Sequence, residues 1–362
     1  MAHALPKRLV IGLAVAMIAA AGAAGALGGS GSGTITTIAG RGTLSTPGFS
    51  GDGGPATSAR LYQPNGVAVD GQGNVYVSDF NNHRVRKISR AGKITTIAGN
   101  GQRGNTVPGG KATSTIVWGP ADLALDAGGN VYFTVATTDG VFRVSPDGTL
   151  TLFAGGGTNP NALGDGGPAT SAYIGSTAGG LAVDKKGNVY IAQTVPTGRV
   201  RVVRPDGIIT TFAVAPTSIG DPRSLAVDGK GNVYVGNNGH TVYKVTPGGK
   251  WTRFAGSGTS VGGFSGDGGA ATKAKLNDVR GLAVDGKGNV YIADLRNNRV
   301  RKVTPGGKIT TFAGSNPIAG LSGDGGLATK ARLAYPQAVA VDAKRNVYIA
   351  DSGNNRVRKV RP

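Results

Sequence analysis

Short apolar runs, each followed by a turn rich in Gly and Asn, recur along the chain from residue 33 onward. Between residues 67 and 99, the segments VAVD, NVYVS, RVRKI and KITTIAG have the branched and aromatic composition of β-strands. The segment GQGN between the first two places Gly where a tight turn requires positive φ. No stretch of this region shows a sustained helical period. The pattern therefore predicts short antiparallel strands.

The same unit is repeated six times. Its landmark is an apolar run that ends in Asp and is followed by a Gly-Asn turn and the dipeptide Val-Tyr. The landmark aspartates are Asp70, Asp126, Asp184, Asp228, Asp285 and Asp342, at spacings of 56, 58, 44, 57 and 57 residues. A fixed period of this kind indicates a repeat architecture. Four antiparallel strands in each of six repeats predict an all-β fold, a six-bladed β-propeller.

The two ends of the chain support a closed ring. The chain stops at NNRVRKVRP, residues 354–362, directly after a third strand, so the sixth repeat lacks its own fourth strand. The segment GTITTIAG, residues 33–40, is a fourth strand that no repeat precedes. We therefore expect the N-terminal strand to complete the last four-stranded blade. This closure would remove an exposed strand edge from the propeller at residues 34–362.

The segment before the first strand predicts export. Lys7 and Arg8 precede a long apolar run, and the small residues Ala24–Ala26 suit a cleavage site, so residues 1–26 resemble a signal peptide. Residues 27–33 are a Gly/Ser-rich linker. An uncleaved membrane anchor is the alternative, because the run is about as long as a bilayer span. We expect a secreted or envelope-associated monomer with no membrane span after cleavage.

Composition limits the chemistry. The formal net charge is +20, and the chain contains neither Cys nor Glu. A strongly basic protein favours contact with polyanions. Few aromatic residues accompany the basic ones, which argues against nucleic acid and leaves an anionic polysaccharide, a wall polymer or a protein as partner. The third strands repeat the motif RVRK, whose second arginines, Arg86, Arg301 and Arg358, are the candidate polyanion contacts.

A second candidate site is the repeated loop SGDGG, at residues 50–54, 265–269 and 322–326. In a propeller this loop shares a face with the loop between the second and third strands. The resulting clusters are Asp52 with Asp79 and Arg84, Asp267 with Asp294 and Arg299, and Asp324 with Asp351 and Arg356. Clustered carboxylates suit a ligand or Ca²⁺. We favour a structural turn, in which Asp binds backbone N–H groups and the three arginines pair with Asp79, Asp294 and Asp351.

Catalytic signatures are sparse. Beyond the signal segment the only histidines are His83 and His240, in different repeats, so neither a zinc site nor any other cofactor is expected. The residues that start the first strands, at the channel mouth, include only two acids, Asp122 and Asp278. We therefore expect a non-catalytic binding or scaffold module. The alternative is a hydrolase or lyase that uses a carboxylate-bound divalent cation such as Ca²⁺ near the channel.

The first repeat resembles the NHL-repeat family. The matching pattern joins PNGVAVD, GNVYVSD and NNHRVRK, and it recurs in repeats five and six. Repeats two, three and four keep the first two strands but lose the segment D-x-x-N-N-x-R. The SGDGG loop is similar to loops of exported bacterial NHL proteins and of teneurin-type cell-surface proteins. The resemblance implies a propeller, but the family includes RNA-binding modules, sensors, adhesion modules and a few enzymes, so it implies no single function.

Overall fold

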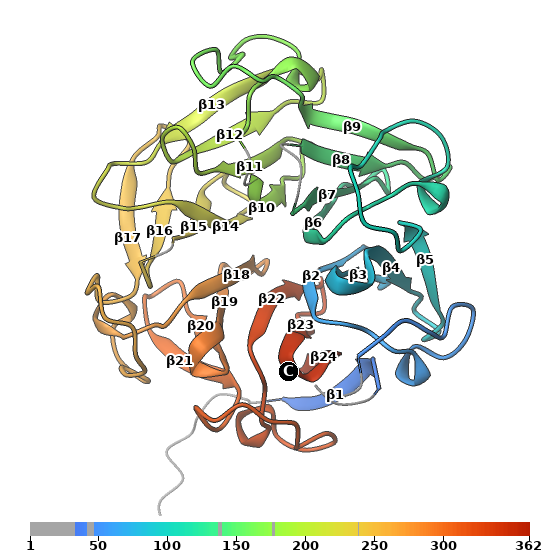
Figure 1. The fold of residues 1–362 in the computed structure, drawn as a ribbon. Helices are drawn as coiled ribbons and strands as arrows, with labels where there is room; N and C mark the ends of the chain where they lie inside the picture. The colour runs from blue at the N-terminus through green and yellow to red at the C-terminus, as the bar shows by residue number, and fades with distance from the viewer. Residues whose placement is uncertain (1–32, 42–46, 137–139, 176–177, 238) are drawn as a thin grey trace, which may run out of the picture. The chain divides into compact units, whose positions relative to one another are not determined.

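The computed structural model describes residues 33–41, 47–136, 140–175, 178–237 and 239–362. The predicted signal peptide and linker lie outside these residues, apart from Gly33. The described residues form six separate four-stranded antiparallel sheets, which are the blades of a β-propeller (Figure 1). This confirms the predicted fold. We number the blades 1 to 6 by the order of their first strands. Within the described ranges, no helix is long and apolar enough to cross a membrane.

The strands follow the repeat closely. Blades 1 and 2 contain β2 (Pro64–Val69), β3 (Val75–Asp79), β4 (Arg84–Ile88), β5 (Ile94–Ala98), β6 (Pro120–Leu125), β7 (Val131–Val135), β8 (Gly140–Val144) and β9 (Leu150–Gly155). Blades 3 and 4 contain β10 (Ala178–Val183), β11 (Val189–Gln193), β12 (Arg199–Val203), β13 (Ile209–Val214), β14 (Pro222–Val227), β15 (Val233–Asn237), β16 (Val242–Val245) and β17 (Trp251–Ala255). Blades 5 and 6 contain β18 (Val279–Val284), β19 (Val290–Asp294), β20 (Arg299–Val303), β21 (Ile309–Ala313), β22 (Pro336–Val341), β23 (Val347–Asp351), β24 (Arg356–Arg361) and β1 (Thr34–Ala39).

The first strand of each blade lies at the centre of the ring, and each contacts the first strands of its two neighbours (Figure 1). Strand β2 contacts both β6 and β22, so the ring is continuous. Prolines occupy the first position of β2, β6, β14 and β22. This position suits Pro because it lies at the start of a strand, where the missing N–H removes no ladder bond.

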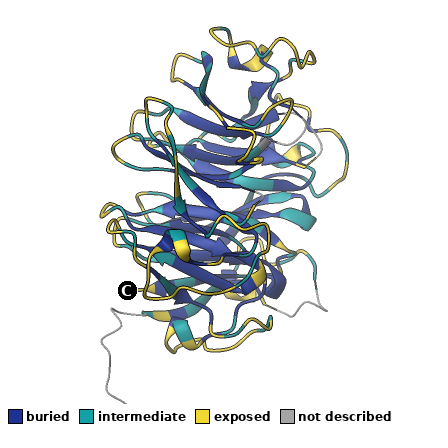
Figure 2. Ribbon diagram, turned by 90° about the vertical axis from the view of Figure 1, so that its left-hand side faces the viewer, coloured by how far each residue is buried: buried dark blue, intermediate teal, exposed yellow. Residues whose placement is uncertain are grey.

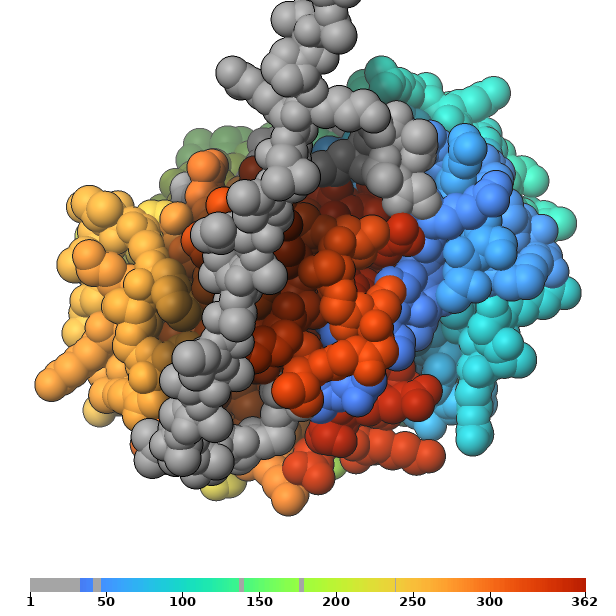
Figure 3. Space-filling view, turned by 90° about the horizontal axis from the view of Figure 1, so that it is seen from below, coloured from blue at the N-terminus to red at the C-terminus, as the bar shows by residue number. Residues whose placement is uncertain are grey.

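The N-terminal strand closes the ring as expected. Strand β1 pairs antiparallel with β24, with Thr34 opposite Arg361 and Thr37 opposite Arg358. Figure 3 shows the first described residues, in blue, against the last residues of the chain, in red. Blade 6 is therefore built from both ends of the chain, so ring closure depends on residues more than 300 positions apart.

The core lies between the blades. One cluster of buried residues joins Leu61 and Ile88 of blade 1 with Tyr348 and Val357 of blade 6. The strands are largely buried, whereas the connecting loops carry most of the exposed residues (Figure 2). Full burial of one Val or Ile side chain contributes about 1.5–3 kcal/mol, so these interfaces supply much of the stability.

An aspartate hub holds the turn between the first two strands in every blade. In blade 1, Asp70 Oδ1 accepts a hydrogen bond from the Asn74 backbone N–H, and Asp70 Oδ2 accepts from the Asn74 amide and the Tyr76 hydroxyl. The same three bonds recur around Asp126, Asp184, Asp228, Asp285 and Asp342. The hub is the physical reason for the repeated spacing of Asp, Asn and Tyr.

Candidate functional site

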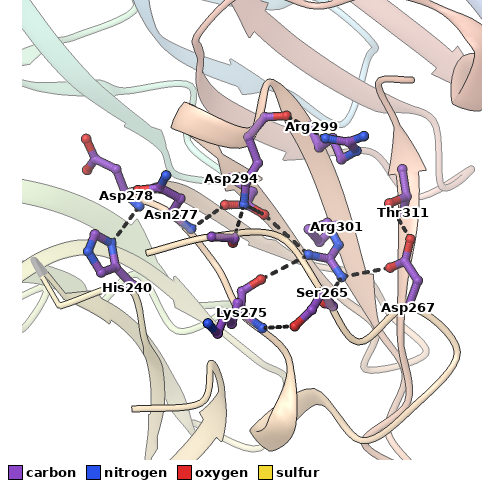
Figure 4. A network of polar contacts seen from close by, with 12 residues as sticks. His240, Ser265, Asp267, Lys275, Asn277, Asp278, Asp294, Arg299, Arg301 and Thr311 are labelled. Carbon is purple, nitrogen blue, oxygen red and sulfur yellow. Dashed lines mark hydrogen bonds and ion pairs between the residues drawn. The ribbon is translucent and has the colours of Figure 1, made fainter. Parts of the chain in front are cut away.

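Blade 5 shows what the SGDGG loop does (Figure 4). Arg301, on β20, has a fully buried side chain. Its Nη2 donates to Asp267 of the loop at 2.7 Å, and its Nη1 donates to Asp294, at the end of β19, at 3.4 Å. Nη2 also donates to the Ser265 carbonyl at 3.1 Å. One guanidinium thus joins the loop to the strand end, an arrangement that we call the Asp–Arg–Asp clamp.

Blades 1 and 6 repeat the clamp. Arg86 lies 2.7 Å from Asp52 and 3.1 Å from Asp79. In blade 6 the clamp comprises Arg358, Asp324 at 2.8 Å and Asp351 at 3.2 Å. Blade 3 has a variant in which Arg201 binds Asp165 at 2.7 Å and the Gln193 amide oxygen at 3.0 Å. The structure therefore brings together the predicted aspartates, but around a different arginine.

Threonines occupy the second oxygen of each loop carboxylate. The hydroxyl groups of Thr96 and Thr311 donate to Asp52 and Asp267, both at 2.6 Å. Thr211 and Thr37 make the equivalent bonds to Asp165 and Asp324. The loop carboxylates are therefore used to fasten the loop across the outer strands of its blade. The geometry supports the structural interpretation of the loop, although Arg and Thr side chains are the donors instead of backbone N–H groups.

The predicted pairing of Arg84, Arg299 and Arg356 is wrong. Arg84 donates to the backbone carbonyls of Asn82 and Asn100, and its guanidinium lies 3.8 Å from the centre of the Phe49 ring. Arg299 does the same with Asn297, Ser315 and Phe264, and Arg356 donates to the Gly40 carbonyl. Although these arginines lie opposite the strand-end aspartates in register, they turn back over the loops. The arginine two positions later reaches the carboxylate instead.

The polyanion contacts predicted at Arg86, Arg301 and Arg358 are also wrong. All three side chains are fully buried and are paired with two carboxylates each. The reason is that the SGDGG loop folds back over the third strand. It covers the arginine side chains that the strand pattern alone predicts to face solvent. A buried and neutralised guanidinium contributes neither a contact nor a substantial field to a polymer outside.

Burial has the largest effect on the pKa values of the strand-end carboxylates of the clamps. It raises the pKa of Asp79, Asp294 and Asp351 to about 6. Hydrogen bonds oppose this rise: for Asp79 the donors are the Asn82 amide, the Tyr62 backbone N–H and Arg86. The clamp thus offsets part of the cost of holding a carboxylate away from water.

The two histidines link neighbouring blades. His83 Nδ1 accepts from the Gly119 backbone N–H at 3.3 Å, and His240 Nδ1 accepts from the Asp278 N–H at 2.9 Å. Asn298 and Asn355 make the same link to the next blade through their amide oxygens. All four residues have positive φ, between 52° and 61°. Among the described residues, no group of three or more His or Asp side chains is placed to hold a metal ion.

The opposite face of the propeller carries a set of lysines that sequence reasoning missed. They stand two positions after the hub aspartates in four consecutive blades, and we call them the lysine crescent: Lys186, Lys230, Lys287 and Lys344. All four are exposed, and none of their ammonium groups has a hydrogen bond or ion pair with a described residue. A hollow of about 600 Å³ extends across blades 3 to 5 and is lined by Lys185, Lys230 and Lys287. The signal was visible as the turns KKGN, GKGN, GKGN and AKRN.

Two protein-family models match parts of this chain. The NHL repeat model matches residues 61–88 and 333–360, which hold the first three strands of blades 1 and 6. The chain is a β-propeller that contains NHL repeats. The teneurin NHL domain model matches residues 262–321 of the same propeller, around the clamp of blade 5.

Relatives of the NHL-repeat propeller are much longer proteins. Mouse Teneurin-1 is 28% identical over 265 residues, covering 70% of this chain and 8% of the teneurin. The chloroplastic protein SUPPRESSOR OF QUENCHING 1 of Arabidopsis thaliana is 25% identical over 313 residues, covering 85% of this chain and 26% of the relative. The chain therefore spans less than a third of the length of these relatives.

Solved structures share the fold at low identity. An auxiliary nutrient binding protein from Bacteroides ovatus has a TM-score of 0.67 at 19% identity, covering 91% of this chain and 76% of that one. A similar protein from Bacteroides thetaiotaomicron has a TM-score of 0.66 at 16% identity, with coverages of 90% and 75%. Virginiamycin B lyase from Staphylococcus aureus has a TM-score of 0.51 at 16% identity, with coverages of 83% and 95%. At these identities the likeness is one of fold.

Proposed function

We propose that this NHL-repeat propeller is an exported, non-catalytic binding module that contacts an anionic polymer of the cell envelope or extracellular space. The observation that carries the proposal is the lysine crescent. Four exposed lysines occupy the same turn position in consecutive blades, so they form a curved row of positive charge on one face. A flexible polyanion can follow such a row and release counterions as it binds.

The local surroundings leave these lysines available. Each hub aspartate binds the Asn and Tyr of its own turn, so it is not paired with the neighbouring lysine. The lysine is held on a rigid turn, and only its side chain must be ordered on binding. Lysine presents a point charge without a fixed fork of donors, which suits a polymer bound by charge more than by shape.

Two observations from relatives agree with a binding role. Two structural neighbours are described as auxiliary nutrient binding proteins, and the teneurin NHL domain model matches this propeller. The cation-dependent alternative would use the channel carboxylates Asp122 and Asp278, and Asp278 is already paired with Arg280 and Arg296. We therefore favour binding over hydrolysis or lyase chemistry.

The test removes the positive charges of the lysine crescent and keeps the fold. Binding of immobilised dextran sulfate is measured for the parent and for the fourfold variant K186Q/K230Q/K287Q/K344Q across a salt series. Affinity at low salt should fall by roughly tenfold or more, and the slope of log affinity against log salt should become shallower by about one for each lysine that contacts the polymer.

The chain offers a matched control outside the hub turns. Lys111, Lys273, Lys275 and Lys330 are equally exposed and lie on or beside the short 3₁₀ turns that follow the SGDGG loops or their equivalent. The variant K111Q/K273Q/K275Q/K330Q loses the same charge, so it should weaken binding by less than about threefold if the crescent makes the contact. Equal losses in the two variants would show a general field effect and would overturn the assignment to the lysine crescent.

A further inference from the structure

The central channel has a mouth on the face that carries the Asp–Arg–Asp clamps. The residues that line this mouth change in chemistry around the ring. Each first strand places its second residue there: Asn65, Ala121, Gly179, Arg223, Arg280 and Gln337. Neighbouring positions in the same strands repeat from blade to blade, whereas this position changes from amide to small residue to arginine. The ring thus has a polar wall at blades 6 and 1, an open wall at blades 2 and 3, and a cationic wall at blades 4 and 5.

These residues surround a hollow of about 400 Å³. Small-molecule sites in proteins commonly measure about 300–1,000 Å³ and place a few convergent polar groups around the ligand. The hollow is therefore suited to a molecule the size of an amino acid or a short peptide. Gly179 and Gly180 line the hollow without side chains, and a Cβ at either position would meet the backbone of Arg223 or Ser224 in the next blade.

The cationic wall contains one oriented and one free guanidinium. Arg280 is held by Asp278, with Nε 2.8 Å from Oδ1 and Nη2 3.2 Å from Oδ2, so its Nη1 takes no part in the pair. Arg223 is part-buried and makes no side-chain hydrogen bond or ion pair with any residue that the structure describes. Guanidinium groups recognise carboxylates through paired hydrogen bonds.

The facing wall contains a carboxylate where the other blades have small residues. Asp122, on β6, occupies the position that holds Gly66, Gly180, Ser224, Gly281 and Ala338 in the other blades. Its Oδ2 accepts from the Leu181 N–H at 2.7 Å, and no described cation forms an ion pair with it. Blade 2 lies across the ring from blade 5, so Asp122 and Arg280 belong to opposite walls (Figure 1). Asp221 is exposed beside Arg223.

We propose that this channel mouth binds a small zwitterion, an α-amino acid or a short peptide with free ends. The ligand's carboxylate binds Arg223 and Arg280, and its ammonium group binds Asp122. The amide side chains of Asn65 and Gln337 hydrogen-bond the middle of the ligand. A simple anion would meet the repulsion of Asp122, and a simple cation would meet that of Arg223, whereas a zwitterion satisfies both walls.

The test uses the parent protein and three peptides. Trialanine, N-acetyl-trialanine and trialanine amide are titrated calorimetrically at pH 7. Trialanine should bind saturably, and blocking either end should weaken binding by at least tenfold, the loss expected for one charged hydrogen-bonded contact. Absence of saturable trialanine binding, or equal binding of the three peptides, would overturn the proposal.

Substitutions in the two walls test which wall binds each end of the peptide. The double variant R223Q/R280Q should bind trialanine and its amide with nearly equal affinity, and D122N should bind trialanine and its acetylated form with nearly equal affinity. Asn retains an oxygen for the Leu181 N–H, and melting curves confirm that each variant is folded. If both variants keep the full discrimination of the parent, the assignment of the two walls is wrong. The lysine crescent lies on the other face, so the fourfold lysine variant should bind trialanine normally, and the two proposals fail independently.

Discussion

At the residue scale, the chain contains its own comparison of blades with and without the clamp. The four blades whose loop carries Asp have Arg at the matching position of the third strand: Arg86, Arg201, Arg301 and Arg358. Blades 2 and 4 lack that Asp, and they have Phe142 and Tyr243 at the same position. The loop aspartate and the buried arginine therefore occur together or are both absent, which is expected of a structural pair.

We predict that R301Q destabilises the protein strongly. The substitution leaves Asp294 buried without its cation, and breaking a buried pair in this way costs about 3–5 kcal/mol of unfolding free energy. D267N should cost about 1 kcal/mol or less, because the Asp267 side chain is 38% exposed. Urea unfolding curves of the two variants and the parent measure both values.

A double variant provides the control for R301Q. R301F/D294V copies Phe142 and Val135, the apolar pair that blade 2 holds at these positions. Replacing both partners removes the unpaired charge, so its loss of stability should be smaller than that of R301Q. A double variant as unstable as R301Q would show that the clamp contributes more than the neutralisation of Asp294.

We also predict a pH dependence from Asp122. Burial raises its pKa from 3.8 to about 6, so the folded protein binds this proton more tightly than the unfolded chain does. The resulting stabilisation is fully present below pH 4 and is lost as the pH rises through 6. Between pH 4 and pH 7 the parent should lose about 2 kcal/mol more unfolding free energy than D122N. Urea unfolding at four pH values gives the difference, and parallel curves would contradict the shifted pKa.

At the element scale, the decisive strand is β1. It supplies the outer edge of blade 6, and its Ile35 is completely buried. The Ile35 N–H donates to the Gly326 carbonyl of the SGDGG loop at 3.0 Å, and Thr37 donates to Asp324 of the same loop. One short strand thus holds the last strand of the chain and the loop that leads into blade 6.

Deleting residues 33–40 should lower the melting temperature and promote aggregation, because β24 then presents an unpaired edge. A peptide with the sequence of residues 33–40, added in excess, should restore the melting temperature by strand addition. The same peptide with Pro in place of Ile35 lacks the N–H and the apolar side chain, so it should not. Light scattering and thermal melts follow both effects, and a truncated protein that melts like the parent would refute ring closure by β1.

At the scale of the whole molecule, the two faces of the ring have different chemistry. The clamp face fastens its loops with buried ion pairs and has a polar channel mouth, whereas the opposite face presents the lysine crescent. Both arise from one repeat, because loops vary while the strands that hold them keep the same pattern. A repeat fold can therefore present two surfaces of different chemistry.

We predict that the whole molecule needs no divalent cation for stability. The loop carboxylates already accept hydrogen bonds from Arg and Thr, so a cation would have to displace these donors. Addition of EDTA should leave the melting temperature unchanged within about 1 °C, because removing a ligand destabilises only a protein that binds it. A drop of roughly 5 °C or more, reversed by Ca²⁺, would restore the cation-site interpretation of Asp52, Asp267 and Asp324.

The sequence by itself determined the strand pattern, the six blades and their closure by the N-terminal strand. These features follow from local composition and from a count of repeats, since each strand must pair with the next and a missing fourth strand must be found elsewhere. The family resemblance could be recognised from the first, fifth and sixth repeats for the same reason.

Only the tertiary structure decided the roles of the side chains. Arg84 and Arg86 are identical in type and lie two positions apart, yet one covers a loop and the other is buried between two carboxylates. The difference arises because a loop more than 30 residues earlier folds over one of them, and strand periodicity carries no information about that contact. The sequence predicts that the first strands begin at the channel mouth, but which of their side chains surround one hollow is decided only where the six strands meet around a common axis.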